Sequence, residues 1–218
     1  MLRNGLEVSI LGAVAAVTSG LWLFFEVAER PEIDAAILMA FRAPGEPDQP
    51  VGPEWLRETM RDLSGLGSPE VLCLLVAVVV IFLLLAARRR MALFIAFTAL
   101  GGGLASVVLK AGFNRPRPDL VPHATFEYGS SFPSGHAMLS AVVYLTFGVL
   151  IAQVTPGRCL KIYIMGIAAA LPVLIGISRV YLGAHWPSDV LAGWAAGAAW
   201  AFGCWLLARV FNLEGAKQ

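Results

Sequence analysis

Six long apolar runs lie along the 218-residue chain, separated by polar connections. They span residues 9–25, 71–87, 91–108, 137–154, 162–177 and 190–211. A helix that crosses a membrane needs about 20 mainly apolar residues, and about 17 is near the lower limit. The runs are continuously apolar, whereas the strands of an outer-membrane barrel alternate between apolar and polar positions. The pattern therefore predicts an all-α integral membrane bundle of six transmembrane helices.

The first run has a second interpretation, as a signal peptide. Arg3 precedes it, and the tripeptide Ala13-Val14-Ala15 is similar to a cleavage site. The apolar residues continue well past that point, however, so we expect a retained helix.

The composition also points to lipid as the solvent of this chain. Hydrophobic residues make up 58% and charged residues 14%, whereas soluble domains have about 45–50% and about 25%. The net charge of +1 gives no reason to expect a nucleic-acid partner. The three cysteines are far apart and show neither disulfide nor metal-site spacing. We treat residues 1–218 as one membrane domain.

Residues 26–70 form the longest polar segment, rich in proline, glycine and acidic side chains. Two pieces of it have the apolar spacing of short amphipathic helices, with a turn-rich break at 44–53 between them. Their apolar positions are Ile33, Ile37, Phe41, Leu56, Met60 and Leu63. We expect both helices to lie at the membrane surface, on the outer side.

The run Arg88-Arg89-Arg90 in a very short connection sets the expected orientation. If both termini are cytoplasmic, the 16 lysines and arginines divide evenly between the two sides. Half of the outer ones belong to the long polar segment, where the positive-inside rule is weak. The arginine run therefore decides, and it predicts a multi-pass plasma (inner) membrane protein with both termini inside. The connections after the third and fifth runs would face outward, toward the periplasm in a bacterial-type cell.

Three polar motifs then fall on that outer face, at residues 110–118, 133–136 and 178–189. Three cations in them could hold a phosphoryl group, arginine through its planar fork. These cations are Lys110, Arg117 and Arg179. Pro133 suits the first position of a helix, so the amides of Ser134, Gly135 and His136 would form an anion site at its N-terminus.

The third motif contains a possible nucleophile. His185 and Asp189 are four residues apart, so on a helix they share one face. A carboxylate that holds one ring N–H leaves the opposite nitrogen as an electron-pair donor. His136 could protonate the leaving oxygen. The three cations could stabilise phosphoryl transfer without a metal, and the sequence contains no carboxylate cluster for magnesium.

These motifs resemble those of the type 2 phosphatidic acid phosphatase family, which read Lys-x6-Arg-Pro, Pro-Ser-Gly-His and Ser-Arg-x5-His-x3-Asp. Every fixed position is present between residues 110 and 189. The resemblance implies a phosphohistidine on His185, oriented by Asp189, with His136 as acid and then as helper to water. It also implies turnover without cofactor or metal, and vanadate as a mimic of five-coordinate phosphorus. The residues that it assigns to the phosphate pocket are Lys110, Arg117, Ser134, Gly135 and Arg179.

The resulting prediction is a hydrolase of lipid phosphates or diphosphates, with the bilayer as its surroundings and no obligatory protein partner evident. Candidate substrates are phosphatidic acid, phosphatidylglycerol phosphate, a polyprenyl diphosphate and lipid A phosphate; residues 26–70 and 115–132 would select among them. One alternative is a phosphotransferase with the same pocket, and another is a catalytically silent lipid-binding protein. The related vanadium haloperoxidases share the pocket, but they are soluble.

The remaining polar and aromatic residues near the motifs have less specific interpretations. Arg115 fits no motif position, so we expect a surface or headgroup contact. We assign no role to His123, whereas Tyr128, Phe132 and Trp186 could line the pocket or lie at the interface. The run 101–103 of three glycines is expected to permit close helix packing.

Overall fold

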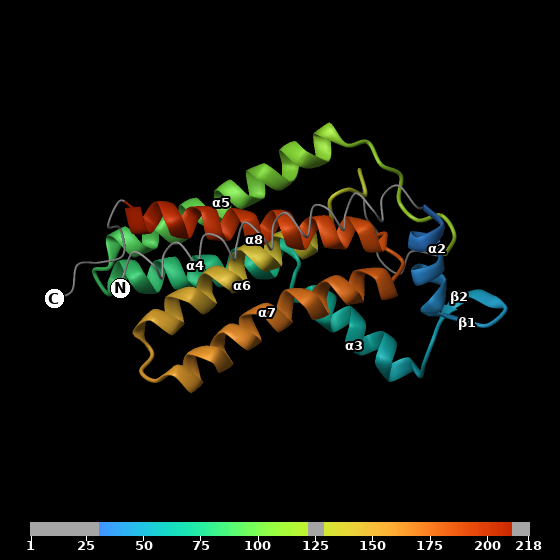
Figure 1. Cartoon of the computed structure of the whole chain (residues 1–218), viewed down its shortest axis with the longest axis horizontal. Coiled ribbons are helices and arrows are strands. Elements are labelled where there is room, and N and C mark those ends of the chain that lie inside the picture. The colour runs from blue at the N-terminus through green and yellow to red at the C-terminus, as the bar shows by residue number, and fades with distance from the viewer. Residues whose placement is uncertain (1–30, 122–128, 211–218) are drawn as a thin grey trace.

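The computed structural model describes residues 31–121 and 129–210, so the first expected span, 9–25, lies outside the described residues. Within them the chain is helical apart from one antiparallel hairpin (Figure 1). The helices are α2 (Pro31–Ala40), α3 (Glu54–Gly65), α4 (Pro69–Leu85), α5 (Arg89–Gly112), α6 (Gly135–Val154), α7 (Arg158–Tyr181) and α8 (Pro187–Val210). The hairpin joins β1 (Arg42–Ala43) to β2 (Glu46–Pro50), with Arg42 opposite Pro50.

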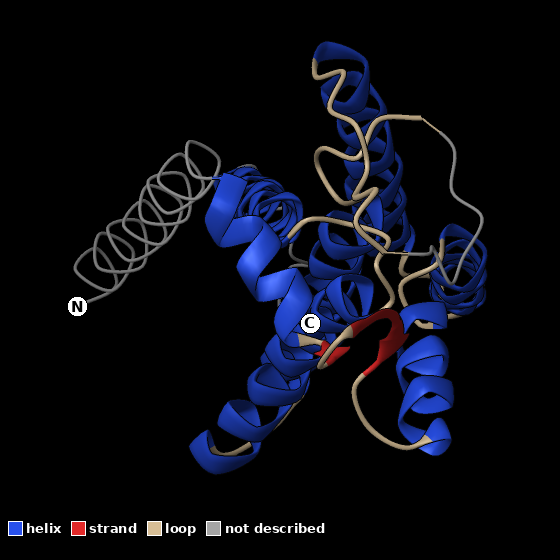
Figure 2. Cartoon of the chain, turned by 90° about the vertical axis from the view of Figure 1, so that its right-hand side faces the viewer, coloured by secondary structure: helices blue, strands red, loops and turns tan. Residues whose placement is uncertain are grey.

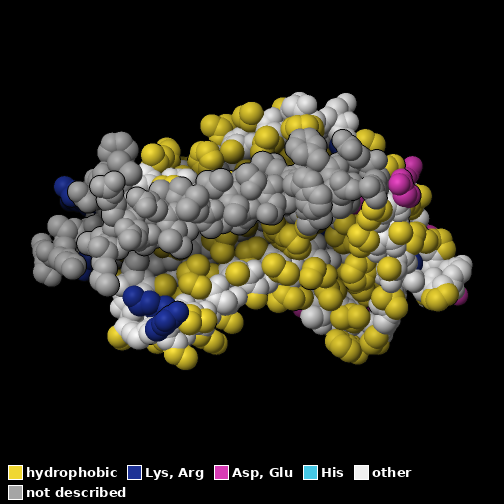
Figure 3. Space-filling view, viewed as in Figure 1, with side chains coloured by type: hydrophobic (Ala, Val, Ile, Leu, Met, Phe, Trp, Pro, Cys, Tyr) yellow, Lys and Arg dark blue, Asp and Glu magenta, His cyan; other side chains and the backbone are white. Residues whose placement is uncertain are grey.

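Four of the described helices, α5 to α8, are long and apolar enough to cross a membrane, and α3 with α4 forms a fifth candidate bent by 48°. The five apolar runs after residue 70 coincide with α4 to α8, which confirms a helical membrane protein. Large apolar side chains such as Leu85 and Leu100 are exposed on the outer flanks of these helices. Hydrophobic side chains cover most of the described surface between the two ends in Figure 3. Such a surface suits lipid as its solvent.

Small residues allow the helices to approach one another closely around α6. A Cβ atom at Gly193 of α8 would lie 2.7 Å from the carbonyl oxygen of Ser134, and Gly197 abuts the carbonyl of Met138. Gly101 faces the ring of Trp200 and Gly102 faces Val142, which confirms the packing role expected for them. Gly103 has nothing within 4 Å of such a Cβ position.

The polar segment before α4 packs on the bundle. Short helices at both expected places are confirmed as α2 and α3, but the turn-rich break between them forms a hairpin that the sequence did not predict. Arg42 is buried and donates to the carbonyl oxygen of Tyr181 at the end of α7 (2.8 Å), and the Tyr181 hydroxyl donates to the carbonyl of Val51 (2.9 Å). A cation suits a helix C-terminus, where carbonyl groups carry partial negative charge. Hydrogen bonds therefore hold the hairpin segment against the C-terminal end of α7.

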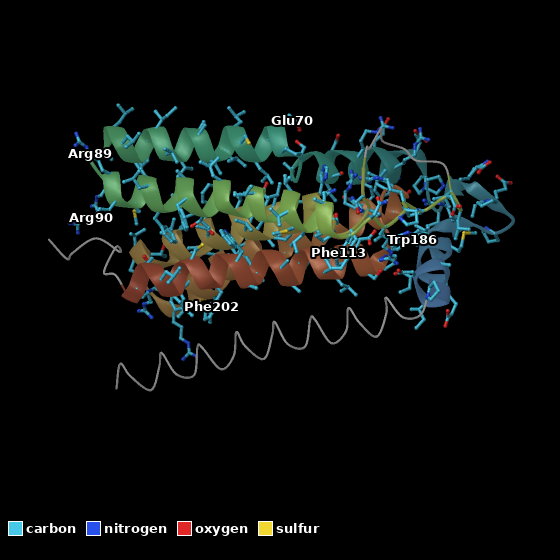
Figure 4. All side chains as sticks on the ribbon, turned by 90° about the horizontal axis from the view of Figure 1, so that it is seen from above. Glu70, Arg89, Arg90, Phe113, Trp186 and Phe202 are labelled. Carbon is cyan, nitrogen blue, oxygen red and sulfur yellow. The ribbon has the colours of Figure 1, made fainter. Side chains whose placement is uncertain are left out.

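The two ends of the bundle differ in chemistry. α2, the hairpin and the loops that carry the three motifs gather at one end, which faces the viewer in Figure 2. Arg89 and Arg90 lie at the opposite end from Phe113 and Trp186 (Figure 4). The bundle therefore brings the motif loops to one end and keeps them apart from the arginine run.

Candidate active site

Three contacts join the three motifs to one another. The N–H of Ser134 donates to the carbonyl oxygen of Asp189 (3.0 Å), which links the second motif to the third. Arg117 Nη1 donates to the carbonyl oxygen of Ala184 (3.0 Å), directly before His185. The side chain of Lys110 lies over Gly135, with Cε 3.5 Å from the position of a Cβ there. Segments far apart in the sequence therefore form one site.

Gly183 ends α7 two residues before His185 and so helps to place His185 in this site. Its φ of 73° lies in the left-handed region, which side chains other than glycine rarely adopt. The N–H of Gly183 donates to the Val180 carbonyl and that of Ala184 to the Arg179 carbonyl, both at 3.0 Å. This bond pair is the Schellman motif, which closes many helices with a glycine. The chain reverses there, and His185 follows two residues later.

His185 is fully buried in the turn between α7 and α8. Its Nδ1 lies 3.6 Å from Oδ2 of Asp189, slightly beyond direct hydrogen-bond distance. Ser131 lies beside both groups: its hydroxyl donates to Oδ2 of Asp189 and is 3.4 Å from Nδ1 of His185. The Trp186 N–H also donates to Oδ2 (3.0 Å). Sequence reasoning did not single out Ser131, although it lies only two residues before the second motif.

The environment of His185 favours a neutral ring. Burial lowers its pKa from 6.5 to about 4; Asp189 opposes this shift, and the charges of Arg179 and Arg117 add to it. Because Nδ1 faces a carboxylate, we assign the ring proton to Nδ1, which leaves the electron pair on Nε2. That Nε2 atom is buried and has no hydrogen-bond partner in the described part of the chain. Burial therefore favours a neutral ring with its electron pair on Nε2.

The start of α6 provides polar groups for an anion, with two differences from expectation. α6 begins at Gly135 with Ser134 as its N-cap, so Pro133 precedes the cap and is not the first helical residue. The Ser134 amide is already bonded to the Asp189 carbonyl, so the helix-start amides that could face an anion begin at Gly135. The buried Ser134 hydroxyl has no partner among residues 31–121 and 129–210. An unpartnered hydroxyl and ring nitrogen at one site suit a bound oxyanion.

The three predicted cations line this site from different elements. Arg179 is buried on the last turn of α7, and its Nη1 donates to the hydroxyl of Ser64 at the end of α3 (2.6 Å). Lys110 donates to the carbonyl of Ser130 (3.3 Å), and Arg117 donates to that of Gly129 (3.3 Å). Ser64 is a further residue that the sequence did not reveal, because it lies 115 positions before its partner.

Arg115 contradicts its predicted role as a surface or headgroup contact. Its side chain is 24% exposed, and Nη1 donates to Oδ1 of Asp189 at 2.7 Å. Nη2 donates to Oδ2 of Asp34 on α2, also at 2.7 Å. The prediction was wrong because the extended segment after α5 folds back across the site, which no local pattern indicates. Asp34 itself gave no signal beyond its place in the first turn of a short helix.

The other predicted residues lie around this arrangement. His136 is half-buried on the first turn of α6. Phe132 packs edge-on against Phe113, and the indole N–H of Trp186 donates to the carbonyl of Pro116 (3.1 Å), so both support the loops. His123 and Tyr128 lie outside the described residues. In the part that the structure describes, no group of three or more His, Cys, Asp or Glu side chains could hold a metal ion.

A helical membrane bundle with a buried histidine–carboxylate pair among cations is the arrangement expected of a membrane phosphatase. The model of the PAP2 superfamily matches residues 91–212, and the chain belongs to that superfamily. This result confirms the resemblance inferred from the three motifs and the prediction of a membrane-bound phosphoric ester hydrolase.

Individual relatives agree with this assignment. Phosphatidylglycerophosphatase B of Bacillus subtilis is 34% identical over 146 residues, which cover 66% of this chain and 70% of that protein. Lipid A 1-phosphatase of Rhizobium johnstonii is 34% identical over 117 residues, 48% of this chain and 43% of that one. The crystal structure of a transmembrane PAP2-type phosphatidylglycerolphosphate phosphatase from Bacillus subtilis is similar in fold, with a TM-score of 0.78 and 28% identity. It covers 94% of this chain and 98% of that one.

Proposed function

We propose that this protein hydrolyses the phosphate ester of a membrane lipid, with phosphatidylglycerol phosphate as the first candidate, through a phosphohistidine on His185. The observation that carries the proposal is the buried Nε2 atom of His185, which has no partner in the described structure, on a ring whose opposite nitrogen, Nδ1, faces the carboxylate of Asp189. The similarity to a phosphatidylglycerophosphatase B supports this choice of substrate.

In the first step, Nε2 of His185 attacks phosphorus and the bond from phosphorus to the lipid oxygen breaks. His136 gives a proton to that oxygen, which leaves as an alcohol. The ring then carries positive charge because Nδ1 keeps its proton, and Asp189 stabilises this charge. In the second step, water attacks phosphorus, His136 accepts a water proton, and the electron pair returns to Nε2.

The charge on the transferring group is stabilised by the cations and the helix start. Lys110, Arg117 and Arg179 would contact its oxygens, together with the Ser134 hydroxyl and the amides from Gly135 onward. Arg179 is already held in place by Ser64, so its fork need not be ordered during the reaction. Residues of this chain thus supply the stabilisation, and we propose that turnover needs no metal.

We further propose that the site faces the outer side of the plasma membrane and that both termini are cytoplasmic. The arginine run supports this orientation, because Arg89 and Arg90 lie at the end opposite the motif loops (Figure 4). Reporter fusions test it: a fusion at residue 89 should report a cytoplasmic position. A periplasmic report there would reverse the topology.

A panel assay tests the reaction and the substrate together. Purified protein in detergent is given phosphatidylglycerol phosphate, phosphatidic acid, lipid A 1-phosphate and undecaprenyl diphosphate, and released phosphate is measured with and without excess chelator. We expect release to be fastest from phosphatidylglycerol phosphate and unaffected by chelator. His185→Ala should abolish it in a protein that still folds.

The same panel separates the alternatives. Lipid A 1-phosphate is the second candidate substrate, favoured by the similarity to a lipid A 1-phosphatase. A phosphotransferase would leave little free phosphate and a phosphorylated acceptor when an alcohol is present, whereas a lipid-binding protein would release phosphate from no substrate. Undiminished turnover by His185→Ala would refute the mechanism.

A further inference from the structure

Asp34 is a buried carboxylate that belongs to none of the three motifs. It lies on α2 with 1% of its surface exposed, although α2 is a short helix before the bundle. Its Oδ1 accepts the N–H of Ser188 (2.9 Å), and its Oδ2 accepts the Ser188 hydroxyl. A buried carboxylate is costly in free energy unless it is paired and hydrogen-bonded, and Asp34 has such partners.

Asp34 binds the first turn of α8, which carries Asp189. The first amides of a helix lack acceptors within the helix, and a carboxylate is favoured there by charge as well. α8 begins at Pro187, so the amide of Ser188 is one of these donors. Its acceptor comes from α2, 154 positions earlier in the chain. α2 therefore fixes the turn from which Asp189 reaches toward His185.

Arg115 connects the two carboxylates directly. Its two terminal nitrogens divide between them, one at 2.7 Å from Asp189 and the other at 2.7 Å from Asp34. Nη1 also donates to the hydroxyl of Ser188 (2.7 Å). A planar guanidinium with both ends occupied has little freedom to move, so Oδ1 of Asp189 is held while Oδ2 faces Ser131 and the ring.

Asp34, Arg115 and Asp189 form a charged cluster with a net charge of −1. This net charge matters for the reaction. If Arg115 faced Asp189 alone, it would cancel the charge that the phosphorylated ring needs. Asp34 neutralises Arg115 instead, so the cluster retains one negative charge against the positive ring of the proposed phosphohistidine. In a buried site such charges interact more strongly than in water.

We propose that Asp34 and Arg115 are positioning residues that hold Asp189 in place and set the negative charge presented to the His185 ring. This inference rests on the proposed function, since it concerns the nucleophile assigned there. Their effect is distinct from that of the cations proposed to contact the phosphate. The charges of Arg179 on α7 and Arg117 in the loop after α5 lower the pKa of the ring, and Lys110 of α5 and His136 of α6 are further titratable groups of the candidate site.

A cycle of charge-changing variants tests the proposal. Asp34→Asn makes the cluster neutral, Arg115→Gln gives it a charge of −2, and the double variant returns it to −1. For each protein, the pH dependence of phosphate release is measured together with kcat and KM. The substrate's own titration is the same in all four proteins. Differences between the acid limbs of their pH–activity profiles, where activity falls at low pH, therefore arise from the enzyme.

We expect the acid limb to move to lower pH in Asp34→Asn and to higher pH in Arg115→Gln, each by roughly half a unit or more. In the double variant it should return close to its original position. We expect kcat to fall about 10- to 100-fold in Arg115→Gln, as for other groups that orient a reacting side chain, with a much smaller change in KM. A purely structural contact would lower activity without moving the two limbs in opposite directions.

The exposed pair Glu54 and Arg57 on α3 supplies a matched control. Glu54→Gln, Arg57→Gln and their double variant change charge at the same end of the bundle, and we expect less than a twofold effect on kcat. If Arg115→Gln does not fold, Arg115→Lys keeps the charge without the fork. It should lower kcat while leaving the acid limb in place, and a displaced limb in that variant contradicts the proposal.

The outcomes separate this inference from the proposed function. If His185→Ala is inactive but the two single-charge variants shift their acid limbs together or not at all, Asp34 and Arg115 do not set the charge at the ring. If His185→Ala remains active, the nucleophile itself is misassigned, and the inference loses its basis with it.

Discussion

The hydroxyl of Ser131 lies 3.4 Å from Nδ1 of His185, closer than the nearest carboxylate. Asp189 is 3.6 Å from the same nitrogen, and the hydroxyl donates to it. Ser131 therefore contacts both the ring and the carboxylate that the sequence indicates as its partner. This relationship makes the loop before the second motif part of the candidate active site.

Ser131→Ala tests that role. We expect kcat to fall about 10-fold or more with little change in KM, because Asp189 would lose a donor and move more freely beside the ring. Phosphate release in detergent measures both constants. Ser140→Ala is the control, since Ser140 is equally buried but its hydroxyl donates only to the Ala137 carbonyl within α6. Equal losses in the two variants would argue against a role for Ser131 at the ring.

Ser64→Ala tests how Arg179 is held. Removing the hydroxyl leaves a buried guanidinium donor without this acceptor, at a cost of about 1–3 kcal/mol in the free energy of unfolding. We expect KM to rise several-fold, because the arginine fork would no longer be ordered before substrate binds. Thermal unfolding and KM are measured against Thr59→Ala, an exposed change on the same helix α3. An unchanged KM would show that Ser64 does not position Arg179 for substrate.

The buried His185 predicts a pH dependence of stability with a definite sign. Its pKa is about 4 in the folded chain and 6.5 for an exposed histidine, as in the unfolded chain. The unfolded chain therefore binds the extra proton first as pH falls. Above about pH 6.5 the ring makes no contribution to this dependence. Between 6.5 and 4 it lowers the free energy of unfolding, by at most about 1.4 kcal/mol per pH unit.

Chemical unfolding in detergent at several pH values measures this effect. Comparison with His185→Asn isolates the histidine from the carboxylates that titrate nearby. We expect the difference in unfolding free energy between the two proteins to change between pH 6.5 and 4 and to be constant above that window. A constant difference throughout would mean that the folded and unfolded chains protonate this ring alike.

Gly183→Ala tests the helix ending that delivers His185. At a φ of 73°, a Cβ atom costs about 1–2 kcal/mol, so we expect lower thermal stability and a larger loss of kcat as the turn relaxes. Gly103→Ala is the control because a Cβ there meets nothing within 4 Å. It should leave both quantities nearly unchanged. If Gly183→Ala behaved in the same way, the left-handed turn would not be needed to place the ring.

The sequence alone predicted the helices after residue 70, which the structure confirms, and indicated the motif residues as candidates for the chemistry, for two different physical reasons. A membrane span must be long and apolar because no water satisfies its backbone, so composition over about 20 residues identifies it. Phosphoryl chemistry needs cations, a nucleophile and its carboxylate, and these stand out in an apolar chain. The PAP2 superfamily match agrees with both inferences.

The sequence was not sufficient for the groups that hold those residues. Ser64 and Asp34 are polar residues in a polar segment, and nothing local distinguishes them from neighbours that face solvent. Arg115 was misjudged for the same reason, since it fits no motif position. Their roles depend on contacts across 74 to 154 positions.

By itself, the sequence determined that this protein is a helical membrane hydrolase and indicated candidate side chains for its chemistry, because apolar length and residue type are local properties. Only the tertiary structure decided that Ser131 stands beside the histidine and that Arg115 joins Asp34 to Asp189. It also decided that Ser64 holds Arg179. The reason is that orientation in a buried site is set by hydrogen bonds between elements whose positions depend on packing of the whole bundle.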